Sequence, residues 1–481
     1  MRFISTRGQA KAHTFEEAVL SPGYLSDGGL LMPETIPKIS QTLLQSWRGL
    51  SLPNLCKKIM TFFTEDDISQ EDLGEIVDKA YSRLPVEEVA ALSSFSNGLN
   101  VLELCNTKTL AFKDLSTFIL GRFLEYFLNK RKDHVTIVVG TSGDTGPSSI
   151  EAVRGLDWID IVVLYPHGYC THIQELQMIT TMAENVHCIS AEGSSDDLDL
   201  IIKHVTLDQQ FKTLHNLCSM NSINMIRTLV QIVNFFYGYL AVCKTVGETV
   251  EIVVPTGAAG HITGGCIAYA MGLPVKLVSA VNANDIIHRT ITHGDYSKAS
   301  RVIKTYSVAM DIQIPYNMER ILFLFSNQDA SQVKEVLEEF ESTDKTQIPE
   351  KTLLKMQEVW SSYSCQNDQI IKTMQRCWQE HKYRVCPHTA VGVSYYFEKL
   401  DRQRMNNQDS NLGPTVVFAT AHPAKFPEAE LAAGLEPKST PYIENLRSMP
   451  TRFTEFKEGQ DWVKMLREKI EEISKRLNMD Q

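Results

Sequence analysis

Several features that would assign a protein to a class at sight are missing from this 481-residue sequence. The ten cysteines lie between Cys56 and Cys386 without any C-x-x-C pair, a pattern that predicts reduced thiols and no structural metal. No stretch approaches about 20 uninterrupted apolar residues, so the sequence predicts no membrane span. The first residues contain Glu16 and Glu17 and no apolar run, which is wrong for a secretion signal, and we therefore expect the cytoplasm.

An excess of positive charge is also missing, because 47 basic residues stand against 58 acidic ones and the formal net charge is -11. This balance favours neither a nucleic acid nor an anionic membrane as partner, so any anionic substrate must be held by a local site. Hydrophobic residues make up 43% and charged residues 22%, as in ordinary globular proteins. The length exceeds one hydrophobic core and predicts two or three packed units.

What the sequence does contain is a lysine inside an apolar run. Lys113 lies in the segment LAFKD, between Phe112 and Leu115 with only Asp114 intervening. An ammonium group is costly in such surroundings, and a desolvated lysine readily becomes a neutral amine that can form a Schiff base with a carbonyl or with pyridoxal phosphate. The alternative is a lysine that extends its charged end from an apolar edge into water.

The segment after this lysine predicts a β-loop-α unit. Residues 115–129 have helical spacing, residues 136–139 form a buried strand, and a helix is expected from Ser148. A second strand at residues 161–165 repeats the unit, which predicts a parallel sheet. The loop between strand and helix offers amides and hydroxyls to an anion, or else forms a tight turn with capping residues. It consists of Thr141, Ser142, Gly143, Asp144, Thr145 and Gly146.

A second unit of this kind begins at residues 251–255, a strand of sequence EIVVP. It runs into TGAAGHITGG and a helix, where small residues let the backbone approach a ligand and the first amides can take a phosphate. The loop matches neither G-x-G-x-x-G nor a P-loop, which disfavours dinucleotides and nucleoside triphosphates. A third strand, residues 415–418, ends just before Thr420, the position where ligands bind in open α/β sheets.

Between the two units, residues 221–236 predict a long amphipathic helix with polar residues at its start. These residues either cap the helix or form a pocket wall. They are Asn221, Ser222, Asn224 and Arg227. Residues 326–383 are rich in polar residues and predict exposed helices, and from Trp462 an amphipathic helix is expected.

An apolar-flanked lysine, two anion-binding loops and a hydroxyl at a third strand end together indicate pyridoxal phosphate as cofactor. Eight segments that occur in order along the chain resemble the threonine synthases, pyridoxal-phosphate enzymes of fold type II. They are FISTRG, LSDGGLLMP, LAFKD, GTSGDTG, NSIN, VNANDIIHR, PHTAVG and TAHPAKFPE. Within this family the sequence is most similar to the vertebrate threonine synthase-like proteins, the shorter of the two paralogues.

The resemblance implies a role for each candidate residue. Lys113 would bind the cofactor covalently and remove the substrate Cα proton, and Thr420 would face the pyridine nitrogen. The cofactor phosphate would be held by Gly257, Ala258, Ala259, Gly260 and His261. The loop of Thr141, Ser142, Gly143, Asp144 and Thr145 would bind the substrate carboxylate, and Asn221, Ser222, Asn224 and Arg227 would complete the substrate pocket.

The resemblance also implies the architecture: an α/β fold with two parallel-sheet domains, a helical N-terminal domain, and the cofactor in the cleft between the sheet domains. We expect the N-terminal domain at residues 1–95 and a smaller α/β domain carrying the lysine at 96–235. A larger α/β domain at 236–481 would carry the phosphate loop, a helical insertion at about 326–383 and the C-terminal helix. The oligomeric state cannot be predicted from the sequence.

The sequence departs from the family pattern in three places. The family's HGPT before LAFKD is Asn106-Thr107-Lys108-Thr109, its GNFGD is GAAGH, and the residue before PHTAVG is Cys386 instead of an aspartate. The phosphate loop acts mainly through its amides, so its side-chain changes matter little. The first change should reshape the substrate pocket, and Lys108 would either meet a substrate phosphate or lie in solvent.

Threonine synthases eliminate phosphate from O-phosphohomoserine and then add water to give threonine. If the unsaturated intermediate leaves unhydrated, the products are 2-oxobutyrate, ammonia and phosphate, and O-phosphothreonine reaches the same intermediate. About 2.7 kcal/mol of relative barrier changes the ratio of the two outcomes about 100-fold, which one lost charged hydrogen bond can supply. We therefore expect a phospho-lyase. The alternatives are an authentic threonine synthase and a protein that binds the cofactor without turnover.

Overall fold

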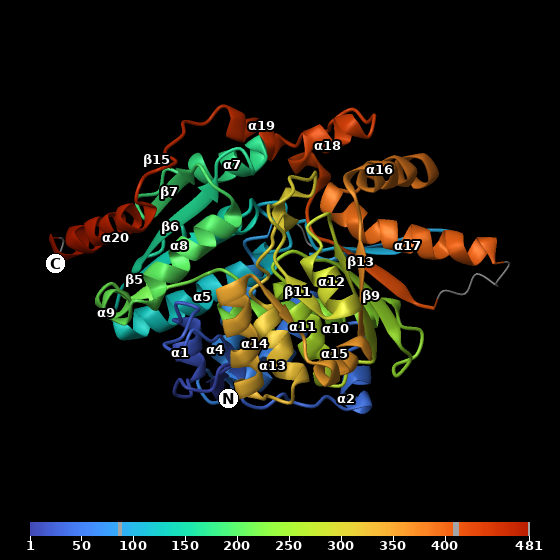
Figure 1. Cartoon of the computed structure of the whole chain (residues 1–481), viewed down its shortest axis with the longest axis horizontal. Coiled ribbons are helices and arrows are strands. Elements are labelled where there is room, and N and C mark those ends of the chain that lie inside the picture. The colour runs from blue at the N-terminus through green and yellow to red at the C-terminus, as the bar shows by residue number, and fades with distance from the viewer. Residues whose placement is uncertain (85–88, 407–412, 480–481) are drawn as a thin grey trace.

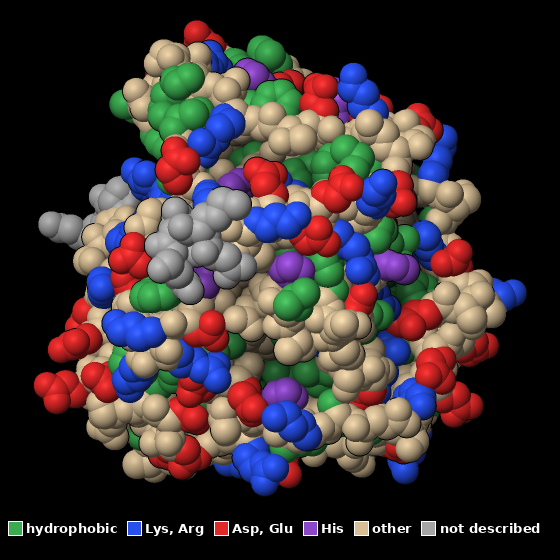
Figure 2. All heavy atoms as spheres, turned by 90° about the vertical axis from the view of Figure 1, so that its left-hand side faces the viewer, with side chains coloured by type: hydrophobic (Ala, Val, Ile, Leu, Met, Phe, Trp, Pro, Cys, Tyr) green, Lys and Arg blue, Asp and Glu red, His purple; other side chains and the backbone are tan. Residues whose placement is uncertain are grey.

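The computed structural model describes residues 1–84, 89–406 and 413–479 of the chain. Two sheets built largely of parallel strands form two lobes, with the five-stranded sheet at the left of Figure 1 and the six-stranded sheet at the right. Figure 2 shows the left-hand face, where basic and acidic side chains lie mixed with one another rather than gathered by sign.

The five-stranded sheet has the order β15-β7-β6-β5-β8, and every neighbouring pair is parallel. Its inner strands are runs of β-branched and apolar residues buried along their length, as expected of a sheet covered on both faces. The strands are β5 (Val135–Gly140), β6 (Ile159–Pro166), β7 (Val186–Ala191), β8 (Leu217–Cys218) and β15 (Thr454–Phe456). The helices of this lobe are α6 (Thr145–Val153), α7 (His172–Ile179), α8 (Ser195–Leu207), α9 (Gln209–Leu214), α19 (Pro441–Arg447) and α20 (Trp462–Met479).

The six-stranded sheet has the order β13-β10-β9-β14-β4-β3, and only β3 runs antiparallel to its neighbour. Its strands are β3 (Ala91–Ser94), β4 (Asn100–Glu103), β9 (Val250–Pro255), β10 (Val275–Val281), β13 (Trp360–Ser364) and β14 (Thr415–Ala419). The helices of this lobe are α11 (Gly260–Ala270), α12 (Ile286–His293), α13 (Met318–Phe325), α14 (Ala330–Thr343), α15 (Glu350–Gln357), α16 (Asn367–His381), α17 (Pro387–Met405) and α18 (Pro427–Ala432). The strands β11 (Asp295–Ser297) and β12 (Lys345–Gln347) form a separate pair.

The N-terminal region is mainly helical, as predicted, with one antiparallel pair of short strands. Its elements are β1 (Phe3–Ser5), α1 (Phe15–Val19), β2 (Leu31–Pro33), α2 (Gln41–Ser46), α3 (Leu52–Thr64) and α4 (Gln70–Tyr81). Apolar faces of α3 and α4 are buried against each other and against the helices of the sheet lobes. This region therefore shares one hydrophobic core with the rest of the chain.

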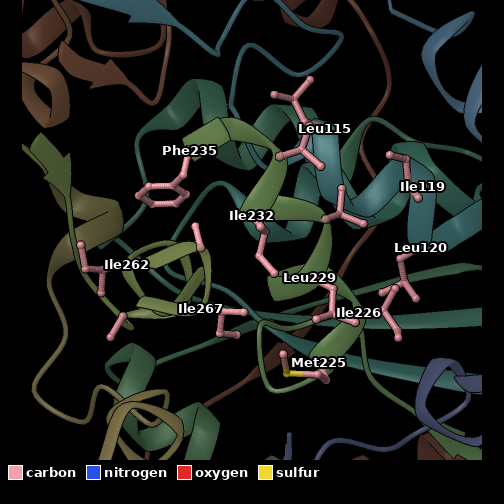
Figure 3. Packing of buried hydrophobic residues seen from close by; sticks show 14 of the residues in the cluster. Leu115, Ile119, Leu120, Met225, Ile226, Leu229, Ile232, Phe235, Ile262 and Ile267 are labelled. Carbon is pink, nitrogen blue, oxygen red and sulfur yellow. The ribbon is translucent and has the colours of Figure 1, made fainter. Parts of the chain in front are cut away.

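Two helices form the centre of that core, α5 (Asp114–Arg131) and α10 (Met225–Val242). Figure 3 shows Ile226 and Leu229 of α10 beside Leu120 of α5, with Ile267 of α11 nearby. By length and composition α10 could cross a membrane, but 78% of it is buried inside the molecule. Its polar side chains are buried too, so α10 is a core helix and not the amphipathic helix that the sequence predicted.

Sheet membership differs from the predicted division of the chain. Strand β4 was expected in the smaller domain, yet it pairs with β14 of the six-stranded sheet. Strand β15 and helix α20 were expected in the larger domain, yet β15 pairs with β7 and α20 contacts α8. Residues 326–383 are also not purely helical, because β13 within them pairs with β10. These pairings join segments far apart in sequence, so local patterns could not reveal them.

Candidate active site

One cavity lies where strands of both sheets end. It is lined by Lys113 and Phe112, by the loops that follow β5 and β9, by the start of α10, and by Thr420 after β14. Loops at the carboxyl ends of parallel strands are where open α/β sheets bind ligands. The cavity therefore lies between the two sheets, where the cofactor was predicted.

Lys113 occupies the N-cap position of α5 and is half-buried at the cavity. Burial lowers its pKa to about 8. The negative charge of Asp144 acts in the opposite direction, while the positive charges of Arg227 and Lys425 lower the pKa further. A neutral amine is consequently well populated near pH 8, as nucleophilic or basic chemistry requires.

The loop after β9 presents backbone rather than side chains. Among the described residues, the amides of residues 257–261 have no protein acceptor, because they form the turn and first residues of α11. Ala259 has a left-handed backbone with φ 61°, which turns the chain into the helix. A Cβ on Gly260 would lie 2.7 Å from Cβ of Ser222, and one on Gly257 would lie 3.1 Å from Cα of Met310. The loop is therefore shaped to bind an anion such as a phosphate through its amides.

His261, the last residue of this loop, lies in an aromatic box. Its ring stacks on Phe112 with centroids 4.6 Å apart and on Phe418 at 5.3 Å, and meets the edge of Phe235 at 5.2 Å. Burial lowers the pKa of His261 to about 3, so the ring is neutral. His261 lines the cavity, but its side chain brings no positive charge to a phosphate.

The loop after β5 is held by its own side chains. Thr141 Oγ1 accepts hydrogen bonds from the amides of Gly143 and Gly146, at 3.1 and 2.9 Å. Within the described residues, the amides of Ser142, Asp144 and Thr145 remain without a protein acceptor. Gly143, whose φ is 136°, does not line the cavity, so its predicted contact with substrate is not supported and its role is to make the turn. The other four predicted loop residues do line it.

Asp144 in this loop forms a buried ion pair that was not predicted. Lys425 Nζ lies 2.7 Å from Asp144 Oδ1 and donates also to the carbonyl of Thr109, at 3.1 Å. Burial alone would raise the pKa of Asp144, but the positive charges of Lys425 and Lys113 outweigh it and hold the pKa well below its usual range. The segment TAHPAKFPE contains Lys425, but no local pattern indicates that it meets a residue 281 positions away.

The start of α10 is only partly a pocket wall. Asn221, Ser222 and Arg227 line the cavity, as predicted. Asn224 does not, because it is the N-cap of α10: its Oδ1 accepts from the amide of Ile226 at 3.1 Å and its Nδ2 donates to two carbonyls. For Asn224 the structure supports the capping alternative, and its predicted contact with substrate is not supported.

The segment that replaces HGPT turns its side chains away from the cavity. Thr109 binds Asp114 through its amide and hydroxyl, at 2.7 and 2.6 Å. Lys108 Nζ lies 5.7 Å from the ring centroid of Tyr442, which is a cation–π contact. None of residues 106–109, all of which the structure describes, lines the cavity.

Several cavity residues were missed in the sequence. His388 lies in PHTAVG, and Asp199 in α8 carries a carboxyl whose pKa burial raises to about 8. Tyr316 accepts from Ser222 Oγ at 3.3 Å. Residues Ala309, Met310 and Ile312 cover the loop after β9. PHTAVG was recognised as a motif, so His388 could have been selected; the other residues carry no local signal.

Comparison with known proteins agrees with this site. Residues 77–418 match the family description "Pyridoxal-phosphate dependent enzyme", residues 2–81 match "Threonine synthase N terminus" and residues 389–466 match "Threonine synthase, C-terminal". The chain is 47% identical to threonine synthase-like 2 of Pongo abelii over 99% of this chain and 98% of that protein. Its fold is similar to PLP-bound threonine synthase from Brucella melitensis, with a TM-score of 0.87, 34% identity and 98% of each chain covered. Yeast threonine synthase gives 0.86, 32% and 98% of each chain.

Fold and site together define a pyridoxal-phosphate-dependent enzyme of fold type II, as predicted. Within that class, the chain belongs to the threonine synthase family. The residues present fit the cofactor: the free amides and close-packed glycines after β9 suit its phosphate, and Lys113 is a half-buried amine with a lowered pKa. Thr420, the predicted partner of the pyridine nitrogen, lines the same cavity.

Proposed function

We propose that this enzyme is a phospho-lyase that removes phosphate from O-phosphohomoserine, O-phosphothreonine or both. One water is consumed for each substrate molecule, and the products are 2-oxobutyrate, ammonia and phosphate. The substrate would be a free amino acid, because its amino group must reach the cofactor at Lys113.

The observation that carries the proposal is a buried arginine without an ionic partner on the cavity wall. Arg227 is 2% exposed, and its guanidinium donates only to neutral oxygens, those of Ser116 Oγ at 3.4 Å and the Met220 carbonyl at 2.9 Å. Burial lowers its pKa to about 10, which still leaves it charged at neutral pH. Among the described residues no carboxylate forms an ion pair with it. A buried unpaired cation is expensive unless a ligand supplies the anion, here the substrate phosphate.

The other cavity residues have complementary tasks in this proposal. Pyridoxal phosphate, when bound, supplies an electron sink next to the substrate Cα. Lys113, with its pKa lowered to about 8, takes the proton from Cα. The free amides of Ser142, Asp144 and Thr145 bind the carboxylate, and Asn221 and Ser222 assist Arg227 at the leaving phosphate.

We favour elimination over hydration because hydration makes an additional demand on the cavity. Adding water at the β carbon requires a water that is held in place and an enclosed site. The segment at residues 106–109, which departs from the family pattern, binds Asp114, Tyr442 and the backbone instead of contributing polar groups to the cavity. Elimination does not depend on that segment.

An authentic threonine synthase is the second candidate, and the observation in its favour is the match of both terminal segments to threonine synthase families. Product analysis separates the two. After complete turnover of O-phosphohomoserine, a lyase gives one 2-oxobutyrate and one ammonia per phosphate and little threonine. Mostly threonine would overturn the lyase and establish the synthase. The same assay with O-phosphothreonine identifies the preferred substrate.

A further inference from the structure

The cavity is covered by a short segment that is held from two sides. This roof, residues 308–312, includes the 3-10 turn η1 (Val308–Met310). The peptide group of Ala309 is its attachment point: Ser142 Oγ donates to the carbonyl at 3.2 Å, and the amide donates to His388 Nε2 at 3.0 Å. The roof is thus linked on one side to the loop after β5 and on the other to α17.

The bond from Ala309 determines which nitrogen of His388 carries the proton. An amide N–H can donate only to a nitrogen with a free lone pair, so Nε2 is unprotonated. Burial lowers the pKa of His388 to about 4, partly opposed by the charge of Asp144, so the ring is neutral and its single proton lies on Nδ1. The ring is 2% exposed and is fixed against Phe426, with centroids 4.7 Å apart.

That proton has no acceptor in the described residues. Nδ1 of His388 is buried and makes no hydrogen bond, although the residue lines the cavity. An unsatisfied buried donor is costly and requires a partner, which beside a cavity can be a bound ligand. His388 is linked to Ser142 through Ala309, and the charge of Asp144 acts on its ring, as do the charges of Lys113 and Lys425. Ser142 and Asp144 both belong to the loop with free amides.

We propose that His388 is a substrate-binding residue whose Nδ1–H donates to the carboxylate of the amino acid held by the loop after β5, while its Nε2 holds the roof closed over that amino acid. The ligand identity rests on the proposed function only in that the substrate is an α-amino acid. The His388 ring would then bind the substrate carboxylate with one nitrogen and hold the roof over the cavity with the other.

Two substitutions separate the two nitrogens. His388→Gln places an amide oxygen near the position of Nε2, so it can still accept from Ala309, but it lacks the donor at Nδ1. His388→Asn places an NH₂ donor near the position of Nδ1 and lacks the acceptor for Ala309. The probe is L-2-aminobutyrate, which has a carboxylate but no leaving group, titrated calorimetrically into the holoenzyme; inorganic phosphate is titrated in parallel.

For His388→Gln we expect aminobutyrate affinity to fall about 10-fold or more, as for a lost hydrogen bond to a charged group, with phosphate affinity unchanged within about twofold. For His388→Asn we expect aminobutyrate affinity within about threefold of the parent and faster hydrogen exchange of the Ala309 amide. Wild-type aminobutyrate affinity in His388→Gln would overturn the proposal, as would equal losses for both ligands. If His388→Asn does not fold, His388→Gln with its phosphate control still decides. These readouts need no elimination, so they are independent of the lyase-or-synthase outcome.

Discussion

The two loops of the site, residues 141–145 after β5 and 257–261 after β9, both connect a strand to a helix, but different interactions hold them in place. The first is fixed by its side chains: Thr141 occupies two of the local amides, and Asp144 is paired with Lys425. The second leaves its amides free and ends in a neutral histidine inside an aromatic box. A glycine-rich loop at a helix start therefore provides amides for an anion in both cases. The buried groups beside each loop decide how that loop is held in place and over which pH range its conformation is stable.

Lys113 lies in the cavity that both loops line, so its removal should have the largest effect on cofactor attachment and turnover. Lys113→Ala should abolish covalent attachment of the cofactor and reduce turnover by about 100- to 10,000-fold, since a positioned base is lost, while the protein remains folded. Reduction and digestion followed by mass spectrometry locates the modified lysine. Lys108→Ala is the matched control and should bind cofactor normally. A pyridoxyl group on any lysine other than Lys113 would refute the assignment.

The loop after β5 should be sensitive to loss of its ion pair. Asp144→Asn leaves Lys425, whose side chain is 0% exposed, without a counter-charge, and breaking a buried pair typically costs about 3–5 kcal/mol. Urea unfolding measures the loss. The control is Asp368→Asn, which breaks an exposed pair with Lys372 and should change little. Similar unfolding curves for both variants would mean that the pair at Asp144 does not stabilise the site.

The loop after β9 should instead be sensitive to added volume. Gly260→Ala places a Cβ 2.7 Å from Ser222, and overpacking of this kind costs about 1–3 kcal/mol, so the dissociation constant of the cofactor should rise about 5- to 150-fold. Gly74→Ala, on α4 with nothing within 4 Å of the new Cβ, is the control and should leave cofactor affinity unchanged. Equal cofactor affinity in the two variants would contradict the close-packed cradle.

Acid should affect the aromatic box around His261 before it affects the Asp144–Lys425 pair. The pKa of His261 is about 3 when folded and about 6.5 when unfolded, so below pH 6.5 the unfolded state binds more protons and stability falls as pH falls. This contribution is about 2 kcal/mol at pH 5. His261→Phe, which suits the aromatic box, should lose less stability than the parent between pH 7.5 and 5 in urea unfolding. The Asp144 pair, with its lowered pKa, weakens only in stronger acid. An unchanged pH dependence in His261→Phe would exclude this origin.

Much of the site was predictable because its candidate residues lie in short segments with recognisable local patterns. The apolar run around Lys113, the strand before each loop and the position of Thr420 after a strand are local patterns, and Lys113, Thr420 and most residues of the two loops line the cavity. The fold type, the cofactor and the family followed from the order of such segments and are confirmed. The roles of the individual cavity residues remain predictions.

The predictions that the structure does not support concern residues whose local pattern fits two different structural roles. Polar residues at a helix start either cap the helix or bind a ligand, and for Asn224 the neighbouring carbonyls decide the first. Glycine in a loop either binds through its amide or makes a turn, and at Gly143 the side chain of Thr141 takes the amide. Residues 326–383 were predicted to be exposed helices, but the segment WSSYS within them continues the six-stranded sheet as β13.

The sequence by itself determined the lysine, the two glycine-rich loops, the parallel β-loop-α units and the family, because each depends on neighbouring residues whose spacing and polarity can be read directly. Only the tertiary structure decided that Lys425 pairs with Asp144 and that Ala309 links Ser142 to His388. It also decided that β4 belongs to the six-stranded sheet and β15 to the five-stranded sheet. Those contacts join segments dozens to hundreds of residues apart. Their energies come from burial and from pairing across the fold, which no local pattern specifies.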